Sequence, residues 1–265
     1  MIADHSANQT KAQPELVALF VSDTHLNAAL PLTTAAFLSF LDKQATQAKS
    51  LYLLGDLFEY WVGDDNISDS YNLPIVQALR KVHDHGVQLY WIAGNRDFLI
   101  GADFSSATGA ILLNDPSVID LAGKKIVLSH GDAQCTDDHA YMKFRAQVRQ
   151  AEWQTTFLAM PLEQRKKIIE GLRTESKMEQ KQKSVAIMDV NADAIAALFL
   201  QTGSSTMIHG HTHRPAIHTN NGQTRYVLPD WDWDCDCDDQ TKRGGWLAAY
   251  SDGNIQAYNW DGNLK

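Results

Sequence analysis

The chain has 265 residues, a length that suits one large domain or one domain carrying a helical insertion. Hydrophobic residues make up 44% of it and charged residues 21%, which is the composition of a globular protein with a packed core. The net charge of −9 argues against general affinity for nucleic acid, so we expect no nucleic-acid partner. The sequence gives no indication of an obligate protein partner.

The cysteine content and the hydropathy bear on the cellular compartment. Three cysteines, at positions 135, 235 and 237, cannot form an even disulfide framework, and residues 1–14 lack the basic start and apolar centre of a secretory signal. No apolar run reaches the roughly 18 residues that a membrane-spanning helix needs. We therefore expect a cytoplasmic protein, with Cys235 and Cys237 as reduced thiols in a loop.

In chain order, apolar runs bounded by turn residues predict strands at Leu16–Val21, Ser50–Leu54, Val87–Ala93 and Lys125–Ser129. Helical periodicity predicts helices at Thr33–Ala48 and Asn72–His85. This alternation is typical of an α/β protein with a parallel sheet, whose ligand sites lie at the carboxyl ends of the strands. Further along, a strand at Ser205–Ile208 and hairpin turns at Asn221-Gly222 and Asp252-Gly253 predict a second, mainly antiparallel sheet.

Residues 138–201 differ from the rest and are predicted to form a helical insertion that caps the site, with the core made of residues 1–137 and 202–265. From position 141 to position 183 ten Lys or Arg face five Glu, a local charge of +5. Two interpretations stay open: a solvated helical face, or a surface for an anionic membrane with a groove for acyl chains. We favour the groove, for which the candidate lining residues are Leu158, Met160, Leu162, Ile168, Ile169 and Leu172.

Seven candidate metal ligands each follow an apolar run: Asp23, His25, Asp56, Asn95, His130, His211 and His213. Carboxylate and amide oxygens mixed with imidazoles suit Mn²⁺, Zn²⁺ or iron. Two adjacent ions need a bridging carboxylate, and Asp56 is the predicted bridge. The Asp-x-His and His-x-His spacings predict that each pair lies on one side of an extended segment. Any one of these motifs is common in ordinary turns, so the prediction rests on their joint occurrence.

The order Asp23-x-His25, Gly55-Asp56, Gly94-Asn95, His130-Gly131-Asp132 and Gly210-His211-x-His213 resembles the calcineurin-like metallophosphoesterase superfamily, over residues 16–260. The resemblance implies a sandwich of two mixed β-sheets flanked by helices. It implies one metal site made of Asp23, His25, Asp56 and His213, and another made of Asp56, Asn95, His130 and His211. It also implies catalytic roles for Asp56, Asn95, Arg96 and His130.

One departure from the superfamily pattern is informative. Where the pattern usually reads Gly-Asn-His-Asp, this chain has Gly94-Asn95-Arg96-Asp97. A histidine can give a proton to a leaving alkoxide, whereas an arginine offers a permanent bidentate clamp for phosphate oxygens. We therefore expect a leaving group that needs no proton, such as a phosphate released from a phosphoanhydride.

Within the superfamily, four segments resemble the family of UDP-2,3-diacylglucosamine hydrolases: residues 94–99, 130–138, 186–191 and 209–215. This resemblance implies hydrolysis of the diphosphate to UMP and 2,3-diacylglucosamine 1-phosphate in lipid A synthesis, by water that two Mn²⁺ ions activate for attack on the α-phosphorus. It implies a lipid-linked UDP-sugar substrate and peripheral association with the anionic inner face of the inner membrane. The implied substrate contacts are Asn95, Arg96, Asp138, Ser176, Gln180, Lys183 and His211, with Gln180 standing where an asparagine is usual.

Two rival functions remain at this point. A soluble nucleotide phosphodiesterase or dinucleoside polyphosphate hydrolase would share the metal ligands but would not need an apolar cap. A non-catalytic scaffold with the same fold is expected to have lost ligands, and this chain keeps all seven.

Overall fold

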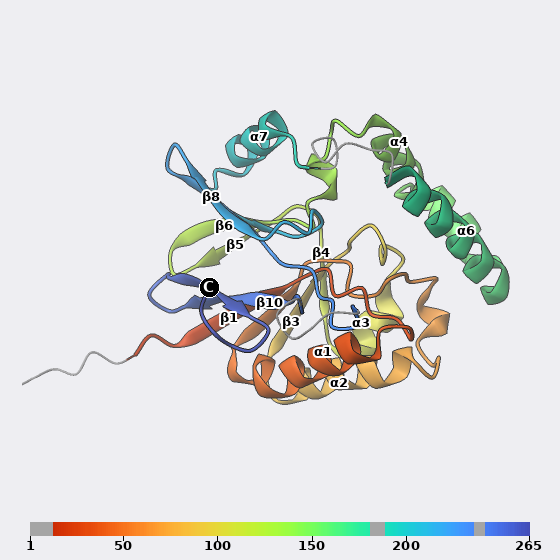
Figure 1. Cartoon of the computed structure of the whole chain (residues 1–265), viewed down its shortest axis with the longest axis horizontal. Helices are drawn as coiled ribbons and strands as arrows, with labels where there is room; N and C mark the ends of the chain where they lie inside the picture. Colours follow the sequence, from red (N-terminus) through yellow and green to blue (C-terminus); the bar gives the residue numbers. More distant parts are fainter. Residues whose placement is uncertain (1–12, 181–188, 236–241) are drawn as a thin grey trace, which may run out of the picture.

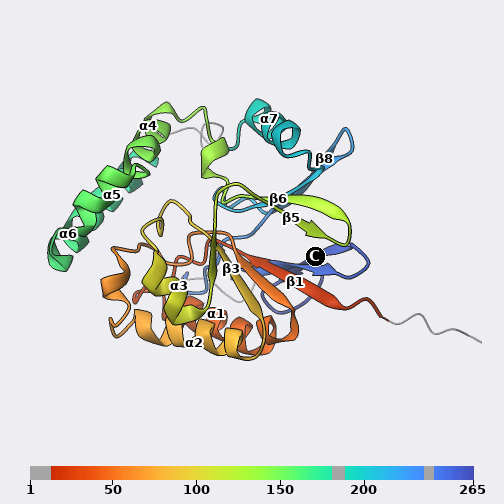
Figure 2. The same ribbon diagram turned by 180° about the vertical axis from the view of Figure 1, so that it is seen from behind.

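Two β-sheets pack face to face in the computed structural model, which describes residues 13–180, 189–235 and 242–265 (Figures 1 and 2). The first sheet has the strand order β11-β10-β1-β2-β3-β4. Its strands are β1 (Leu16–Val21), β2 (Ser50–Leu53), β3 (Gln88–Ile92), β4 (Ile111–Leu113), β10 (Gly245–Tyr250) and β11 (Ile255–Asn259). Strands β1 to β4 run parallel, which confirms the predicted parallel core, and β10 joins β1 antiparallel.

Strands β1 and β2 have apolar residues at consecutive positions rather than at alternate ones, so both faces of each strand can be buried in the sandwich. In β1, Ala18 and Phe20 face the second sheet, while Leu19 and Val21 face the helices on the other side. Both faces of the strands are therefore buried, as is typical of a central parallel strand. Helices α1 (Pro31–Lys43), α2 (Asn72–Asp84) and α3 (Ala102–Thr108) cover the outer face, as Figure 1 shows.

The second sheet has the order β5-β6-β7-β9-β8, with strands β5 (Ser117–Leu121), β6 (Lys124–Leu128), β7 (Thr206–His209), β8 (Ala216–Asn220) and β9 (Gln223–Val227). The prediction of a mainly antiparallel sheet was wrong, because β7 pairs parallel to both β6 and β9. The hairpin at Asn221-Gly222 is confirmed, and both of its turn residues have the positive φ that a two-residue turn needs. The hairpin at Asp252-Gly253 joins β10 to β11 and therefore belongs to the first sheet.

The helices between β6 and β7 fall into two groups. Helices α4 (His139–Val148), α5 (Ala151–Leu158) and α6 (Leu162–Gln180) extend from the edge of the sandwich, as both ribbon views show. Helix α7 (Ala192–Thr202) instead packs its Leu198 and Phe199 against Val127 and Met207 of the second sheet. We call the α4–α6 group, residues 139–180, the cap; the domain boundaries expected from the sequence stay a prediction.

Three short 3₁₀ segments complete the described structure: η1 (Ala45–Gln47), η2 (Asp64–Asn66) and η3 (Asp132–Gln134). No helix within the described residues is both long and apolar enough to cross a membrane. Cys135 is buried. The expectation of a reduced thiol at Cys235 was wrong, because this residue is disulfide-bonded, and Cys237 lies outside the described residues.

Candidate metal centre

The seven predicted ligands lie in turns that follow β1, β2, β3, β6 and β7. Backbone hydrogen bonds join these turns to one another: the Asp23 amide donates to the Gly55 carbonyl, and the His25 amide donates to the Asp56 carbonyl. In the second sheet, the Gly210 amide donates to the His130 carbonyl. Residues far apart in the sequence thus meet because the carboxyl ends of parallel strands share one edge.

The backbone at five of these residues is left-handed rather than extended. Asp23, His25, Asp56, His211 and His213 have φ between 46° and 66°. The prediction that the Asp-x-His and His-x-His pairs sit on extended segments was therefore wrong. A positive φ is unfavourable for residues other than glycine and concentrates at functional sites, where the surrounding structure holds the strain.

Glycines next to the ligands allow the turns to approach one another closely. A Cβ atom on Gly94 would stand 2.2 Å from Asp56 Oδ1, and one on Gly210 would stand 2.1 Å from Asp23 Oδ2. Gly55 combines a φ of 87° with a gap of 2.6 Å between such a Cβ and the Gly94 Cα. Only a hydrogen fits at these positions, which is the physical reason for glycine in the Gly-Asp, Gly-Asn and Gly-His motifs.

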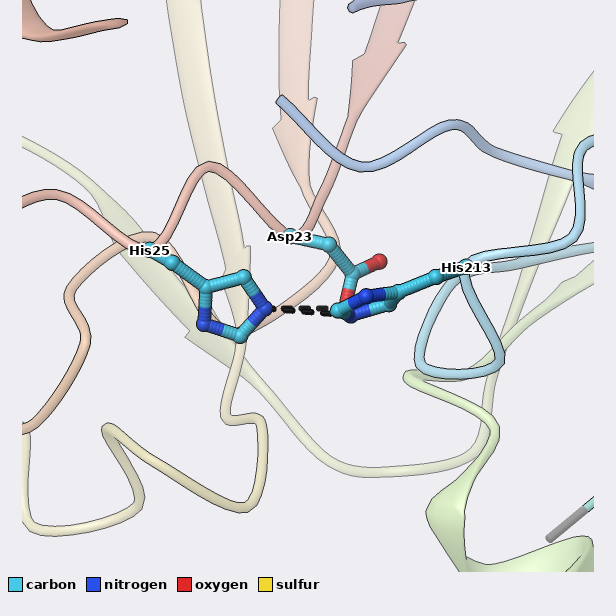
Figure 3. A group of neighbouring side chains, drawn as sticks. All are labelled: Asp23, His25 and His213. Atoms are coloured by element: carbon cyan, nitrogen blue, oxygen red, sulfur yellow. Dashed lines mark hydrogen bonds and ion pairs between the residues drawn. The ribbon is translucent and has the colours of Figure 1, made fainter. Parts of the chain in front are cut away.

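Asp23, His25 and His213 form the first half of the centre, and their side chains converge in Figure 3. Asp23 Oδ1 lies 3.4 Å from His213 Nε2 and 3.9 Å from His25 Nε2, and the two histidine Nε2 atoms are 3.1 Å apart. The Asp23 carboxylate is fully buried and accepts the backbone amide of His211. Three donor atoms of the kinds that bind divalent cations therefore point at one position.

Asn95, His130 and His211 form the second half. Asn95 Oδ1 lies 2.9 Å from His130 Nε2 and 2.9 Å from His211 Nδ1. Asp56 stands between the halves, with Oδ1 at 3.7 Å from His130 Nε2 and Oδ2 at 4.0 Å from His25 Nε2. This position between one histidine of each half is the one that a bridging carboxylate requires.

The charges in the centre fit divalent cations. Burial lowers the pKa of His25 and of His211 to about 4, so both imidazoles are neutral at neutral pH and free to act as ligands. Burial also acts to lower the pKa of His130, but the carboxylates of Asp56 and Asp23 outweigh it and raise that pKa to about 9. A buried cluster whose carboxylates hold a proton on a histidine is one that a cation would neutralise, so the residues present fit the implied metal pair.

Arg96 lies against the centre, and no ion pair joins it to its neighbour Asp97 among the described residues. The Arg96 amide donates to Asp56 Oδ1 at 2.8 Å, while its guanidinium Nε is buried and has no hydrogen-bond partner among the described residues. Asp97 instead accepts the backbone amides of Gly94 and Leu57. A buried donor without a partner beside a cation site suits a phosphate oxygen.

The other implied substrate contacts are placed only in part. Asp138 is buried and caps α4, accepting the Tyr141 amide. Ser176 and Gln180 belong to α6, but their side chains are outside the described structure, and Lys183 lies outside the described residues altogether. The structure therefore does not test these contacts.

Several supporting residues hold the centre together. The Asp132 carboxylate accepts the Tyr141 hydroxyl at 2.5 Å and Arg145 Nε at 2.8 Å, which ties α4 to the core. The neighbouring Leu54 carbonyl, 2.9 Å from His130 Nδ1, fixes that ring. His209 is fully buried beside Arg225 and is not among the candidate ligands.

Sequence reasoning missed Glu59 and Asp230. Glu59 Oε2 lies 2.9 Å from His25 Nδ1, and Asp230 Oδ2 lies 3.8 Å from His213 Nδ1. Neither contact is a hydrogen bond, but both place a negative charge next to the Nδ1 atom of a candidate ligand, where carboxylates are common around metal-binding histidines. For Glu59 the only sequence signal was its place three residues after Asp56.

The sequence matches the family model of the calcineurin-like phosphoesterases over residues 16–215. Among curated proteins, the UDP-2,3-diacylglucosamine hydrolase of Chromohalobacter salexigens is 48% identical over 82% of this chain and 89% of its own length. The proteins of the same name from Aromatoleum aromaticum and Pseudomonas paraeruginosa are 46% and 48% identical, each over 81% of this chain and 89% or 90% of their own lengths.

Proposed function

This chain belongs to the calcineurin-like phosphoesterase family, and we propose that it is the member that hydrolyses the diphosphate of UDP-2,3-diacylglucosamine, releasing UMP and 2,3-diacylglucosamine 1-phosphate for lipid A synthesis. The observation that carries the proposal is the combination of relatives of that name with seven candidate ligand side chains that lie together beside Arg96. The rival function of a soluble nucleotide phosphodiesterase is not favoured, because the relatives are named for a lipid substrate.

We propose that the centre holds two Mn²⁺ ions, one on Asp23, His25, Asp56 and His213 and the other on Asp56, Asn95, His130 and His211. When bound, such cations supply Lewis-acid activation of water and neutralise charge on the diphosphate. The mixed oxygen and imidazole donors suit Mn²⁺ but also Zn²⁺ or iron. Removing the metal and restoring activity with each cation in turn tests the identity: recovery with Mn²⁺ at low concentration is expected, and recovery with Zn²⁺ alone would contradict it.

The role we propose for Arg96 follows from its chemistry. Its guanidinium cannot give up a proton at physiological pH, so it acts on the diphosphate by donating hydrogen bonds to phosphate oxygens as negative charge develops there. The departing sugar phosphate is a stable anion and needs no proton from the protein. Arg96→Ala is expected to lower turnover about 100-fold while Mn²⁺ binding is retained, a magnitude typical of losing one donor to a developing charge. An unchanged turnover rate in Arg96→Ala would contradict the proposal that Arg96 binds the phosphate oxygens.

The side of the diphosphate that reacts is testable with labelled water. Attack at the α-phosphorus puts ¹⁸O from solvent into UMP, and the lipid product stays unlabelled. Label in the sugar phosphate would refute attack at that atom.

The cap is the part of the chain that we propose binds the lipid. Trp153, Met160, Ile168 and Ile169 are partly buried apolar residues that pack on the main core cluster, while Leu158 and Phe144 stay exposed. We also propose Asp138, Ser176, Gln180 and Lys183 as contacts of the sugar and nucleotide. Comparing UDP-2,3-diacylglucosamine with UDP-sugars that lack acyl chains tests this assignment: a large preference for the acylated substrate is expected, and equal rates would favour the soluble-substrate rival.

We further propose that the protein works at the inner face of the inner membrane, held there by the basic cap. The sequence excess of ten Lys and Arg over five Glu between positions 141 and 183 gives this segment a charge opposite to that of the whole chain. Each basic residue near an anionic surface contributes about 1 kcal/mol to binding, and salt screens it. Sedimentation with vesicles containing phosphatidylglycerol, reversed by added salt, is the expected result; no binding to such vesicles would contradict it.

A further inference from the structure

Glu59 stands at a point where the metal centre and the cap meet. It follows the Asp56 turn, and that turn pairs with the His25 turn through two backbone bonds: the Leu26 amide donates to the Leu57 carbonyl, and the Glu59 amide donates to the Leu26 carbonyl. This pairing fixes the Glu59 backbone beside His25. The Glu59 side chain is only 13% exposed, and its Oε2 lies 2.9 Å from His25 Nδ1.

The other carboxylate oxygen of Glu59 faces the cap. Its Oε1 forms an ion pair with Arg173 Nη2 of α6, and the Arg173 guanidinium also lies over the ring of Tyr60, 5.4 Å from its centre. The Arg173 side chain is 21% exposed, so the pair is largely shielded from solvent. One carboxylate therefore contacts a candidate metal ligand and a helix of the cap at the same time.

From this geometry we propose that Glu59 is a positioning residue: it orients the His25 ring so that Nε2 points at the metal, and Arg173 of the docked cap holds Glu59 in that position. The inference deepens the proposed function, since it uses the same metal centre. His25 Nδ1 stands 2.9 Å from Glu59 Oε2 without forming a hydrogen bond, and Nε2 of the same ring lies on the side of Asp23 and Asp56. A carboxylate behind a ligand histidine fixes the ring and its tautomer, and its loss typically lowers metal affinity about 10- to 100-fold.

A second ion pair between core and cap provides a matched control. Arg165 of α6 pairs with Asp65, whose side chain is 57% exposed, and Arg165 also donates to the Val62 carbonyl. Among the described residues, no metal-ligand candidate contacts Asp65. Asp65→Asn removes one charge from a core-to-cap pair just as Glu59→Gln does, but it leaves the surroundings of His25 unchanged.

The test measures Mn²⁺ binding without substrate. Full-length wild type, Glu59→Gln, Asp65→Asn, Arg173→Gln and the double variant of Glu59 and Arg173 are stripped of metal, and free Mn²⁺ is followed by electron paramagnetic resonance during titration. We expect Glu59→Gln to weaken Mn²⁺ binding about 10- to 100-fold and Asp65→Asn to bind as wild type does. Arg173→Gln should weaken binding less, and adding it to Glu59→Gln should have no further effect, because its influence passes through Glu59.

Each contrary result overturns the inference. Wild-type Mn²⁺ affinity in Glu59→Gln would show that the carboxylate does not position His25. An equal loss of Mn²⁺ affinity in Asp65→Asn would show that the effect comes from docking of the cap in general. If the losses of the two single variants add in full in the double variant, Arg173 does not act through Glu59. If Glu59→Gln does not fold, Glu59→Asp, whose carboxylate is one methylene shorter, must show the weakened binding instead. Because no substrate is present, a failure to hydrolyse UDP-2,3-diacylglucosamine would refute the proposed function without affecting this result.

Discussion

Gly94→Ala is the sharpest perturbation that the structure offers, because it adds one methyl group against the predicted bridging ligand. The added Cβ would stand 2.2 Å from Asp56 Oδ1 and 2.4 Å from the Asp56 amide nitrogen. Contacts of a Cβ below 3.0 Å are essentially not observed, so Asp56 or the Gly94 turn must move by at least about 0.8 Å. The two atoms belong to the ligand and its own backbone, so a simple change of rotamer cannot relieve the clash.

Two quantities follow from that displacement. Overpacking a tight site costs about 1–3 kcal/mol, so the melting temperature should fall by several degrees. A misplacement of about 1 Å in a catalytic centre costs on the order of 100-fold in rate, so kcat/KM for UDP-2,3-diacylglucosamine should fall by at least that factor. Thermal unfolding and steady-state kinetics on the same preparation measure the two effects, and a Mn²⁺ titration shows whether the displacement also weakens metal binding.

Gly171→Ala is the matched control, because it makes the same chemical change where nothing lies within 4 Å of the new atom. Gly171 is in the interior of α6, where alanine is better than glycine by about 0.5–1 kcal/mol, so the melting temperature should rise slightly and activity should stay unchanged. If Gly94→Ala binds Mn²⁺ and turns over substrate as Gly171→Ala does, the close approach of the two turns is not required and the reasoning fails.

Three further predictions address the surroundings of the centre. Asp132→Asn removes the charge that Arg145 and the Tyr141 hydroxyl contact, so we expect a loss of about 1–3 kcal/mol and faster hydrogen exchange across α4; unchanged exchange would show that another contact holds the helix. In the metal-free protein the pKa of His130, raised to about 9 from its ordinary value of 6.5, contributes stability that is fully present below pH 6.5 and is lost as pH rises through about 9. The melting temperature of the metal-free protein should therefore fall between pH 6.5 and about 9, and it should fall less in His130→Asn. If the melting temperature of both proteins depends on pH with the same slope, the raised pKa of His130 is refuted. Burial raises the pKa of the Cys135 thiol to about 12, so iodoacetamide at pH 8 should leave Cys135 unmodified in the native protein and alkylate it in denaturant, as read by peptide mass spectrometry.

The sequence alone was sufficient for the parallel half of the fold and for singling out the candidate ligands that the fold brings together. β1 begins and ends where its apolar run does, and α2 begins at the predicted residue, because burial on both faces and helical periodicity are written in consecutive residues. The candidate ligands could be singled out because each is a metal-binding residue type just past such a run. Arg96 could be singled out because its chemistry differs from that of histidine wherever the side chain points.

Other features depended on which segments pair, and no local pattern records that. The hairpin of β10 and β11 could have extended either sheet; it pairs with β1, and the second sheet is mixed because β7 lies between β6 and β9. The left-handed backbone at Asp23, His25 and Asp56 is unfavourable by itself and persists only because neighbouring turns hold it. Local residue preferences therefore could not have predicted it.

Glu59 shows most clearly the difference between what the sequence and what the tertiary structure determine. Nothing in the sequence distinguishes Glu59 from other glutamates, and it contacts both the metal centre and the cap only because the fold brings His25 to one of its oxygens and Arg173 to the other. The residue types determine which atoms can bind metal, and those types could be read directly from the sequence. The tertiary structure decided which of those atoms meet and what orients them, because contacts between distant segments depend on the packing of the whole chain.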